Sequence, residues 1–294
     1  MINVLVTGSA GFVGRHVVVR LKANSNIDRI VSYDNYDPLC GGWTKESPDP
    51  VVGDVTDYTW LQNIVRIHGI THIVHLAAYA RNLTCRDYPL RAWEVNTQGT
   101  MNVLEIARRE KLKRVVVCSS NIALSDVPTV YRESKRAVES LVALYASLGV
   151  STMALRPSNI YGVGQSRTEY QMCAFCGLDA AFERAGFFSI TGNGEQTRDW
   201  THVDDVARAF EVVLFSDVRG DTIDVCTGIQ TSMNEVASLL DVPVKYIDPR
   251  PGDAKELISD PTGMETTFGF EAIEKIEDRI WDAFPAVAKA RGRV

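Results

Sequence analysis

The sequence has few of the features that mark membrane, secreted or nucleic-acid-binding proteins. Its 294 residues contain no apolar stretch near the roughly 18 residues that a membrane-spanning helix needs. Lys and Arg total 31 against 37 Asp and Glu, and no long basic run is present. Neither a membrane nor a nucleic acid is therefore an expected partner. The chain enters an apolar run at Ile2 without a leader-like segment, so we expect a cytoplasmic protein.

Cysteine and histidine are also scarce, with six and five residues respectively. The cysteines are scattered, which is typical of reduced thiols in a cytoplasmic protein. Cys173 and Cys176 form a close pair in an expected helix, but no second pair of ligands accompanies them, so we expect buried thiols and no metal site. His68, His72 and His75 lie in or near apolar runs and are expected to be packing residues.

The 45% hydrophobic content allows a sizeable core, and the amino terminus indicates its architecture. The apolar run from Ile2 to Thr7 is followed by Gly8, Gly11 and Gly14 and by an apolar segment from Phe12 to Leu21. A strand, a glycine turn and a helix in this order form a cradle for a pyrophosphate, because the turn lets backbone N–H groups approach the anion. The pattern predicts a dinucleotide site.

A second strand, Arg29 to Tyr33, ends at Asp34, twenty residues after Gly14. A carboxylate at this place can bind both ribose hydroxyls of adenosine and would repel a 2′-phosphate. The sequence therefore favours NAD over NADP. An ordinary strand-turn-helix with a capping aspartate is the alternative.

Four further segments resemble buried strands separated by helical stretches. They are Val51 to Asp57, Thr71 to Ala78, Arg114 to Ser120, and Thr152 to Arg156. Continuous apolar strands of this kind predict an α/β fold with a doubly wound, Rossmann-like parallel sheet. At the strand ends, Asp54 is placed to reach the adenine amino group, and the small residues Ala77 and Ala78 allow a cofactor to lie close.

The pair Tyr131 and Lys135 is the strongest chemical signal in the middle of the chain. A spacing of four places a phenol and an ammonium on one face of a helix. A nearby cation favours the phenolate, so we expect Tyr131 to exchange protons with an alcohol. Ser119 and Ser120 end the preceding strand, where open α/β sheets bind ligands.

Further motifs extend the pattern in order over about residues 2 to 260. Besides the glycine turn and the Tyr131 motif, they are Asp34-Asn35, Asp54, His75 to Ala78, Asn96, Ser119-Ser120, Leu155 to Gly162, Thr191 to Gly194, Arg198 to Asp205, and Pro249 to Asp253. Together they resemble the extended short-chain dehydrogenase/reductase superfamily, and within it the NAD-dependent epimerase/dehydratase family, whose branch acting on nucleotide sugars includes UDP-glucose 4-epimerase.

The resemblance implies a domain organisation and a set of site residues. A Rossmann domain would span residues 1–157 and be rejoined by about 196–226, and a smaller α/β domain for the nucleotide sugar would comprise 158–195 and 227–294. Residues expected at NAD are Gly8, Gly11, Phe12, Val13, Gly14, Asp34, Asn35, Asp54, Val55, Leu76, Ala77, Ala78, Asn96, Ser119, Tyr131, Lys135 and Ser158. Residues expected at the substrate are Arg81, Ser120, Asn159, Arg198, Arg250 and Asp253.

The implied reaction inverts C4 of a UDP-hexose through a transient 4-keto sugar, with Ser120, Tyr131 and Lys135 as catalytic residues. Arg198 and Arg250 would bind the diphosphate, for which the arginine fork is well matched. Asn159 would contact phosphate or sugar, and Asp253 would stand near the ribose. Arg81 would reach the sugar or remain a solvated loop charge.

One departure from the family concerns the connection from Ser120 to Tyr131, which is eleven positions here and about two dozen in related epimerases. Its shortness should reshape the pocket over the sugar. Asn121 and Ile122 stand where nucleotide-sugar dehydratases carry an Asp-Glu pair, which disfavours dehydration. The alternatives are a UDP-uronic acid decarboxylase or epimerase, a 4-ketoreductase, and a non-catalytic NAD-binding regulator.

The segments 96–109 and 131–148 are expected to be amphipathic helices. They would cover the sheet, or also pair with the same helices of a second subunit in a homodimer with a four-helix interface.

Overall fold

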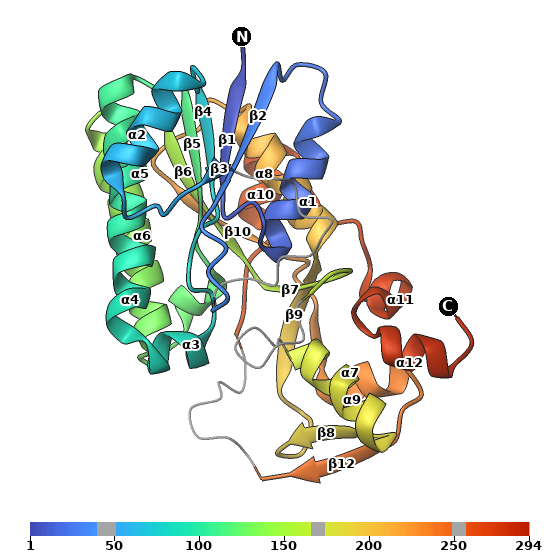
Figure 1. Ribbon diagram of the computed structural model, residues 1–294. Coiled ribbons are helices and arrows are strands. Elements are labelled where there is room, and N and C mark those ends of the chain that lie inside the picture. The colour runs from blue at the N-terminus through green and yellow to red at the C-terminus, as the bar shows by residue number, and fades with distance from the viewer. Residues whose placement is uncertain (40–50, 166–173, 249–256, 294) are drawn as a thin grey trace.

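The computed structural model describes residues 1–39, 51–165, 174–248 and 257–293, and its largest element is a parallel sheet (Figure 1). Seven strands stand in the order β10-β6-β5-β4-β1-β2-β3, and every neighbouring pair is parallel. The strands are β1 (Asn3–Thr7), β2 (Arg29–Asp34), β3 (Val51–Val52), β4 (His72–His75), β5 (Arg114–Cys118), β6 (Thr152–Pro157) and β10 (Thr222–Val225). The predicted Rossmann-like α/β fold is confirmed.

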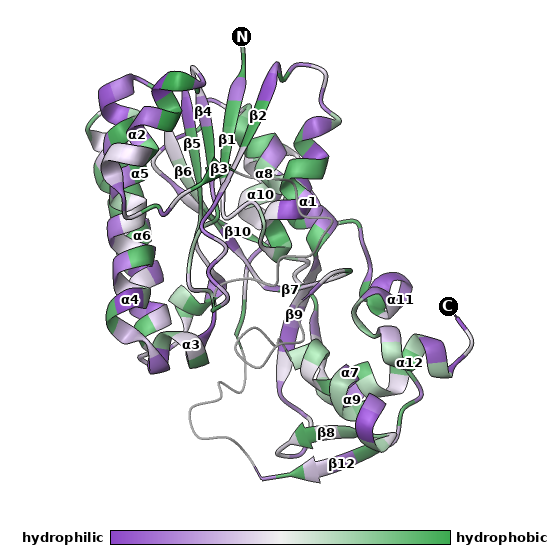
Figure 2. Ribbon diagram, viewed as in Figure 1, coloured by the Kyte–Doolittle hydropathy of each residue, from purple (hydrophilic) through white to green (hydrophobic). Residues whose placement is uncertain are grey.

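Helices cover both faces of this sheet because successive strand residues point to opposite sides. Leu5 belongs to the core under α2 (Tyr58–Ile67), α5 (Gly99–Glu110) and α6 (Val130–Ser147). Val4 and Val6 belong to the core under α1 (Phe12–Lys22), α8 (Val203–Leu214) and α10 (Thr262–Phe268). The helices carry hydrophobic and hydrophilic residues side by side, as amphipathic covering helices do (Figure 2).

A smaller part of the molecule lies beyond the carboxyl ends of the large sheet (Figure 1). It contains a sheet of β7 (Asn159–Tyr161), β9 (Thr197–His202) and β11 (Gln230–Ser232), and a pair of β8 (Phe188–Thr191) and β12 (Val244–Ile247). Its helices are α7 (Ala174–Ala185), α9 (Met233–Leu239), α11 (Ile276–Arg279) and α12 (Pro285–Ala290). Phe175, Phe188, Trp200 and Phe284 are at the centre of its separate core.

The chain passes between the two parts more than once. After β7–β9 it returns to the large sheet through α8 and β10, and then leaves again. Strand β9 pairs with β7 and β11 in the smaller sheet, and α8 follows it directly. The crossing segments therefore line the boundary between the parts.

Short helical segments connect β4 to α5 and β5 to α6. The first connection contains α3 (Asn82–Asp87), α4 (Pro89–Trp93) and a π-helix (Glu94–Gln98), and the second contains a 3-10 helix (Asn121–Leu124). A second 3-10 helix, Ile280–Ala283, precedes α12. Among the described residues, no helix is both long and apolar enough to cross a membrane.

Candidate active site

A cavity of about 530 Å³ lies at the carboxyl ends of the parallel strands. Loops that follow β1, β2, β4, β5 and β6 contribute to its wall, as do α6 and segments of the smaller part. This is the position at which open α/β sheets bind ligands, because the loops on the two sides of a topological switch point diverge there.

The glycine turn forms one end of the cavity, and its glycines are required by close packing. A Cβ at Gly8 would lie 2.7 Å from the backbone nitrogen of Ala77, and one at Gly14 would lie 2.1 Å from the carbonyl oxygen of Gly8. Gly8 also has a φ of +68°, which favours glycine. Gly11 is the N-cap of α1 and offers no side chain to its N–H groups. The turn thus leaves a backbone cradle into which a diphosphate fits.

Asp34 lies beside this cradle at the end of β2. Its Oδ2 accepts a hydrogen bond from the Ala10 nitrogen at 3.0 Å, and its Oδ1 accepts one from the Tyr36 nitrogen at 2.8 Å. Burial raises the pKa of the Asp34 carboxyl. Asn35 and Asp37 line the same end of the cavity, so this end suits the hydroxyl groups of a ribose.

Two residues expected at the cofactor do not line the cavity. Asp54 accepts hydrogen bonds from Asn35 at 3.0 Å and from Thr56, and it forms an ion pair with Arg91. Burial opposes its ionisation, but these hydrogen bonds and the Arg91 charge hold the pKa of Asp54 below its usual value. Its carboxylate fixes Asn35, which does line the cavity.

Asn96, the second of these residues, is buried within the π-helix, with 1% of its surface exposed. Its side chain accepts a hydrogen bond from the Tyr79 nitrogen at 2.7 Å and donates to the Tyr79 carbonyl at 3.0 Å and to Ser134 Oγ at 2.9 Å. Ser134 donates in turn to the Tyr131 carbonyl at 2.8 Å. Asn96 therefore ties the β4 loop to the start of α6.

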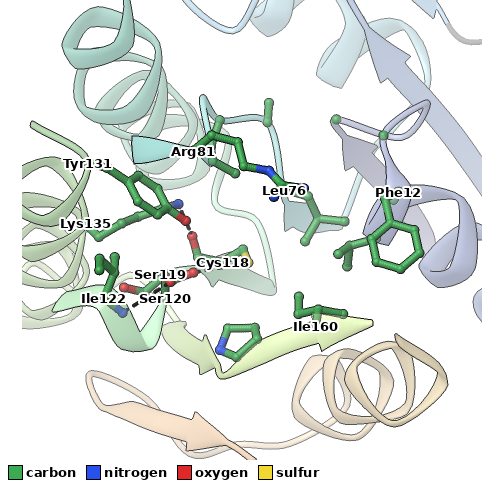
Figure 3. A pocket seen from close by; sticks show the side chains of 18 of the residues that line it. Phe12, Leu76, Arg81, Cys118, Ser119, Ser120, Ile122, Tyr131, Lys135 and Ile160 are labelled. Carbon is green, nitrogen blue, oxygen red and sulfur yellow. Dashed lines mark hydrogen bonds between the residues drawn. The ribbon is translucent and has the colours of Figure 1, made fainter. Parts of the chain in front are cut away.

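At the opposite end, β5 and α6 bring Ser120, Tyr131 and Lys135 together (Figure 3). The Tyr131 and Ser120 hydroxyls are hydrogen-bonded. Lys135 is 3% exposed, its Nζ donates to the Cys118 carbonyl at 2.8 Å, and it stands 5.9 Å from the centre of the Tyr131 ring. Helix α6 begins at Val130, so the spacing of four does place both side chains on one face.

The electrostatics of this cluster differ from the sequence-based expectation. Burial raises the pKa of Tyr131 and outweighs the opposing effects of the Ser120 hydrogen bond and the Arg81 charge. Burial lowers the pKa of Lys135, against the charges of Cys118, Cys85 and Glu139. A phenolate at Tyr131 thus requires more positive charge than the spacing to Lys135 by itself indicates.

Glu139 is a participant that the sequence analysis missed. It follows Lys135 by one turn of α6, and its Oε1 accepts a hydrogen bond from Ser119 Oγ at 2.6 Å. Its two oxygens also pair with Nε and Nη2 of Arg156 at 2.7 and 2.8 Å. Arg156 reaches Asp224 as well, at 3.3 Å. The spacing from Lys135 to Glu139 was the available signal.

Ser158 and Asn159 line the cavity where β6 leads into β7. Ser158 Oγ lies 3.0 Å from Oδ1 of Asp199 and 2.6 Å from Thr201 Oγ1. The Asn159 amide points its Nδ2 at the Asp199 carbonyl, 3.5 Å away. The buried Asp199 thereby organises this wall.

Four charged residues were expected at the substrate. Arg81 and Arg198 both line the cavity, and Nη1 of Arg198 donates to the Thr197 carbonyl at 2.6 Å. Arg250 and Asp253 lie outside the described residues.

The short connection after Ser120 also forms part of the wall. Asn121, Ile122, Ser125, Val127 and Thr129 line the cavity, and the sequence did not identify them as site residues. Asn121 Nδ2 donates to Ser259 Oγ at 3.3 Å, which joins the connection to the C-terminal part of the chain. Among the described residues, no group of three His, Cys, Asp or Glu side chains gathers as metal ligands.

The chain is similar to several known proteins over most of its length. A Methanocaldococcus jannaschii protein, provisionally named a UDP-glucose 4-epimerase, is 29% identical over 256 residues, which cover 81% of each chain. The crystal structure of the Thermotoga maritima UDP-glucose 4-epimerase with UDP-glucose has a TM-score of 0.87 at 25% identity and covers 99% of each chain. MoeE5, solved with UDP-glucuronic acid and NAD, has a TM-score of 0.81 at 27% identity and covers 98% of this chain and 99% of its own.

A family model extends this similarity from single proteins to a family. The model of the NAD dependent epimerase/dehydratase family matches residues 4–226, which include the glycine turn, the strand ends and the Tyr131 cluster. NAD is the cofactor of this family, and the diphosphate cradle at Gly8 to Gly14 fits it. The chain belongs to the NAD dependent epimerase/dehydratase family.

Proposed function

We propose that the protein is an NAD-dependent nucleotide-sugar epimerase that inverts C4 of a UDP-hexose. The observation that carries the proposal is the placement of Ser120, Tyr131 and Lys135 in the same cavity as the glycine turn. A dinucleotide bound at the turn and running along the cavity would end at the three catalytic side chains. This is the geometry that oxidation of a secondary alcohol needs.

The cofactor would be held by groups along the whole cavity. The turn from Gly8 to Gly14 would bind the diphosphate, and Asp34 would bind the hydroxyl groups of the adenosine ribose. The Asp34 carboxylate would repel the 2′-phosphate of NADP, so NAD is favoured. Lys135 and Ser119 would hold the far ribose. When bound, NAD would supply the hydride acceptor for oxidation at C4 and the hydride donor for the reverse step.

Tyr131 would take the proton of the C4 hydroxyl and later return it to the 4-keto oxygen. Ser120 is hydrogen-bonded to the phenol and can hold the same substrate oxygen in line. Because burial raises the pKa of Tyr131, the positive charge of Lys135 below its ring is needed to support the phenolate. The three side chains form one proton-transfer unit.

The substrate would be gripped by its nucleotide and held loosely by its sugar, so that the 4-keto sugar can turn. Arg198, together with Arg250, would bind the diphosphate, with Asn159 and Asp253 as further contacts. The related structures contain UDP-glucose or UDP-glucuronic acid, which supports a uridine diphosphate sugar.

Dehydration is disfavoured by the side chains beside Ser120. Eliminating water from the sugar needs an acid and a base, and Asn121 and Ile122 occupy the corresponding positions. The Asn121 amide is also engaged with Ser259. A decarboxylase or 4-ketoreductase would use the same Tyr131 cluster, whereas a non-catalytic regulator would have no use for it.

The test is incubation of the purified protein with UDP-glucose, UDP-N-acetylglucosamine and UDP-glucuronate without added cofactor, followed by chromatographic separation of products. Formation of C4 epimers would support the proposed reaction, and release of NAD when the protein is denatured would support tightly bound NAD. Loss of carbon dioxide or a strict need for added NADH would contradict it.

We further propose a homodimer formed through α5 and α6. Met101, Leu144 and Leu148 are exposed large hydrophobic residues on or next to these helices, at 37, 51 and 55% exposure. Two copies of this surface would form a four-helix interface.

A cytoplasmic location is supported by the free thiols of Cys85, Cys118, Cys176 and Cys226.

A further inference from the structure

Arg81 enters the cavity from the loop between β4 and α3. It is the N-cap of α3 and has extended backbone angles, with φ −138° and ψ 135°. Its side chain points into the cavity between Tyr131 and Leu76 (Figure 3). Its charge is close enough to Tyr131 to lower the pKa of the phenol. Arg81 therefore lines the stretch of the cavity between the Tyr131 cluster and Leu76 (Figure 3).

Within the described residues, this guanidinium forms no hydrogen bond or ion pair. The other cations of the cavity wall are engaged, since Lys135 donates to the Cys118 carbonyl and Arg198 to the Thr197 carbonyl. Five N–H donors on a half-buried arginine are thus available to a ligand.

Among the described residues that line the cavity, no carboxylate forms an ion pair with Arg81. The described acidic residues of the wall are Asp34, which ends β2, and Asp37, which follows it. Asp37 is also occupied by the Tyr79 hydroxyl at 2.6 Å. When a substrate fills the cavity and removes water, a guanidinium without an anion becomes costly. A neutral hexose leaves that cost unrelieved, whereas a sugar carboxylate relieves it.

We propose that Arg81 is a specificity-determining residue that pairs with the carboxylate of a nucleotide-linked uronic acid. The inference rests on the proposed function, because it assumes that the sugar lies against Ser120 and Tyr131. The planar guanidinium matches a carboxylate with two parallel hydrogen bonds, which a single hydroxymethyl group cannot accept. The short Ser120–Tyr131 connection borders the same end of the cavity.

The experiment measures binding separately from turnover. In a Tyr131→Phe background with NAD bound, calorimetry with UDP-glucuronate and UDP-glucose would be compared for Arg81, Arg81→Gln and Arg81→Lys. Arg86→Gln is the matched control, because Arg86 lies on the same α3, is 70% exposed and pairs with Asp87 outside the cavity. Melting temperatures would establish that each variant is folded.

We expect Arg81→Gln to weaken UDP-glucuronate binding by about 10- to 100-fold and UDP-glucose binding by less than about threefold, as loss of a charge-assisted pair predicts. Arg81→Lys should retain part of the preference, and Arg86→Gln all of it. Equal losses for both sugars, or a weakened hold on NAD, would overturn the proposal and assign Arg81 to a diphosphate. Absence of C4 epimerisation in the unmodified protein would reject the proposed function but not a binding preference that depends on Arg81.

Discussion

The buried pair of Glu139 and Arg156 gives the sharpest prediction about stability. Glu139 has 14% of its side chain exposed and Arg156 has 21%, so both are largely removed from water. Glu139→Gln keeps the shape of the side chain, removes its charge and turns one acceptor oxygen into an NH₂ donor. That donor would face the guanidinium N–H groups of Arg156 or the Ser119 hydroxyl. The substitution therefore separates charge and hydrogen bonding from packing.

The expected cost follows from the bonds that are lost. Glu139 accepts two bonds from Arg156, at 2.7 and 2.8 Å, and one from Ser119 at 2.6 Å. The glutamine side chain has only one oxygen that can accept hydrogen bonds. Losing one charge-assisted hydrogen bond costs about 1.5–3 kcal/mol, and deleting one partner of a buried pair costs about 3–5 kcal/mol. Because Arg156 retains Asp224, we expect a loss of about 2–4 kcal/mol of unfolding free energy.

The matched control is Glu110→Gln in the pair of Glu110 and Arg66. Glu110 Oε1 receives two bonds from Arg66, at 3.0 and 2.7 Å, and one from Gln62 at 2.6 Å, and the side chains of Glu110 and Arg66 are 19% and 57% exposed. Because the Arg66 guanidinium is open to water, we expect this pair to contribute about 0–1 kcal/mol, so the control should change stability less than Glu139→Gln does. The assay is urea unfolding at pH 7.5, comparing midpoints at unchanged slope. If both variants lose the same free energy, the Glu139 pair contributes no more than a surface pair and the reasoning is wrong.

Three further predictions concern pH, catalysis and assembly. Burial lowers the pKa of His72 to about 4 and of His75 to about 3, so stability present above the unfolded pKa of about 6.5 is lost as pH falls below it. Between pH 7.5 and pH 5, each histidine should lower the free energy of unfolding by about 2 kcal/mol. When both proteins are unfolded with urea at the two pH values, the decrease should be about 2 kcal/mol smaller for His72→Gln than for the unmodified protein. Tyr131→Phe should abolish epimerisation but leave NAD bound, measured by product separation and by NAD released on denaturation, and full activity would remove Tyr131 from the mechanism. Leu144→Glu should halve the mass measured by light scattering, and an unchanged mass would place any dimer interface elsewhere.

The large sheet could be predicted because each of its signals is local. The strand from Arg29, for example, shows its apolar character within six residues, and the glycine turn specifies its own geometry through Gly8 and Gly14. The rules for connections in parallel sheets restrict the possible strand orders, and the structure shows which one this chain adopts. The third strand was harder to delimit: within the part of the chain that the structure describes, Val51 and Val52 pair with β2, whereas the expected strand segment ran to Asp57.

The placement of Asp54 and Asn96 outside the cavity wall could not be obtained from their positions alone. Each lies in a motif that suggests cofactor contact, but its side chain is used by partners far away in the sequence. Arg91 comes 37 residues after Asp54, and Ser134 comes 38 residues after Asn96. A spacing pattern shows which residues share an element, and it does not show which distant side chain will occupy a given carboxylate or amide.

The same limitation explains why Glu139 changes the interpretation of the Tyr131–Lys135 pair. The spacing of four implies that Lys135 supports the phenolate, but burial disfavours the ammonium that is needed for this. The charges of Cys118, Cys85 and Glu139 oppose that effect of burial on the pKa of Lys135, and Glu139 is the next residue along the same face of α6. Glu139 in turn forms two hydrogen bonds with Arg156, at 2.7 and 2.8 Å, in a largely buried position. The charge that Tyr131 requires thus depends on a row of three side chains on α6 and on an arginine from β6, which only the folded chain brings together.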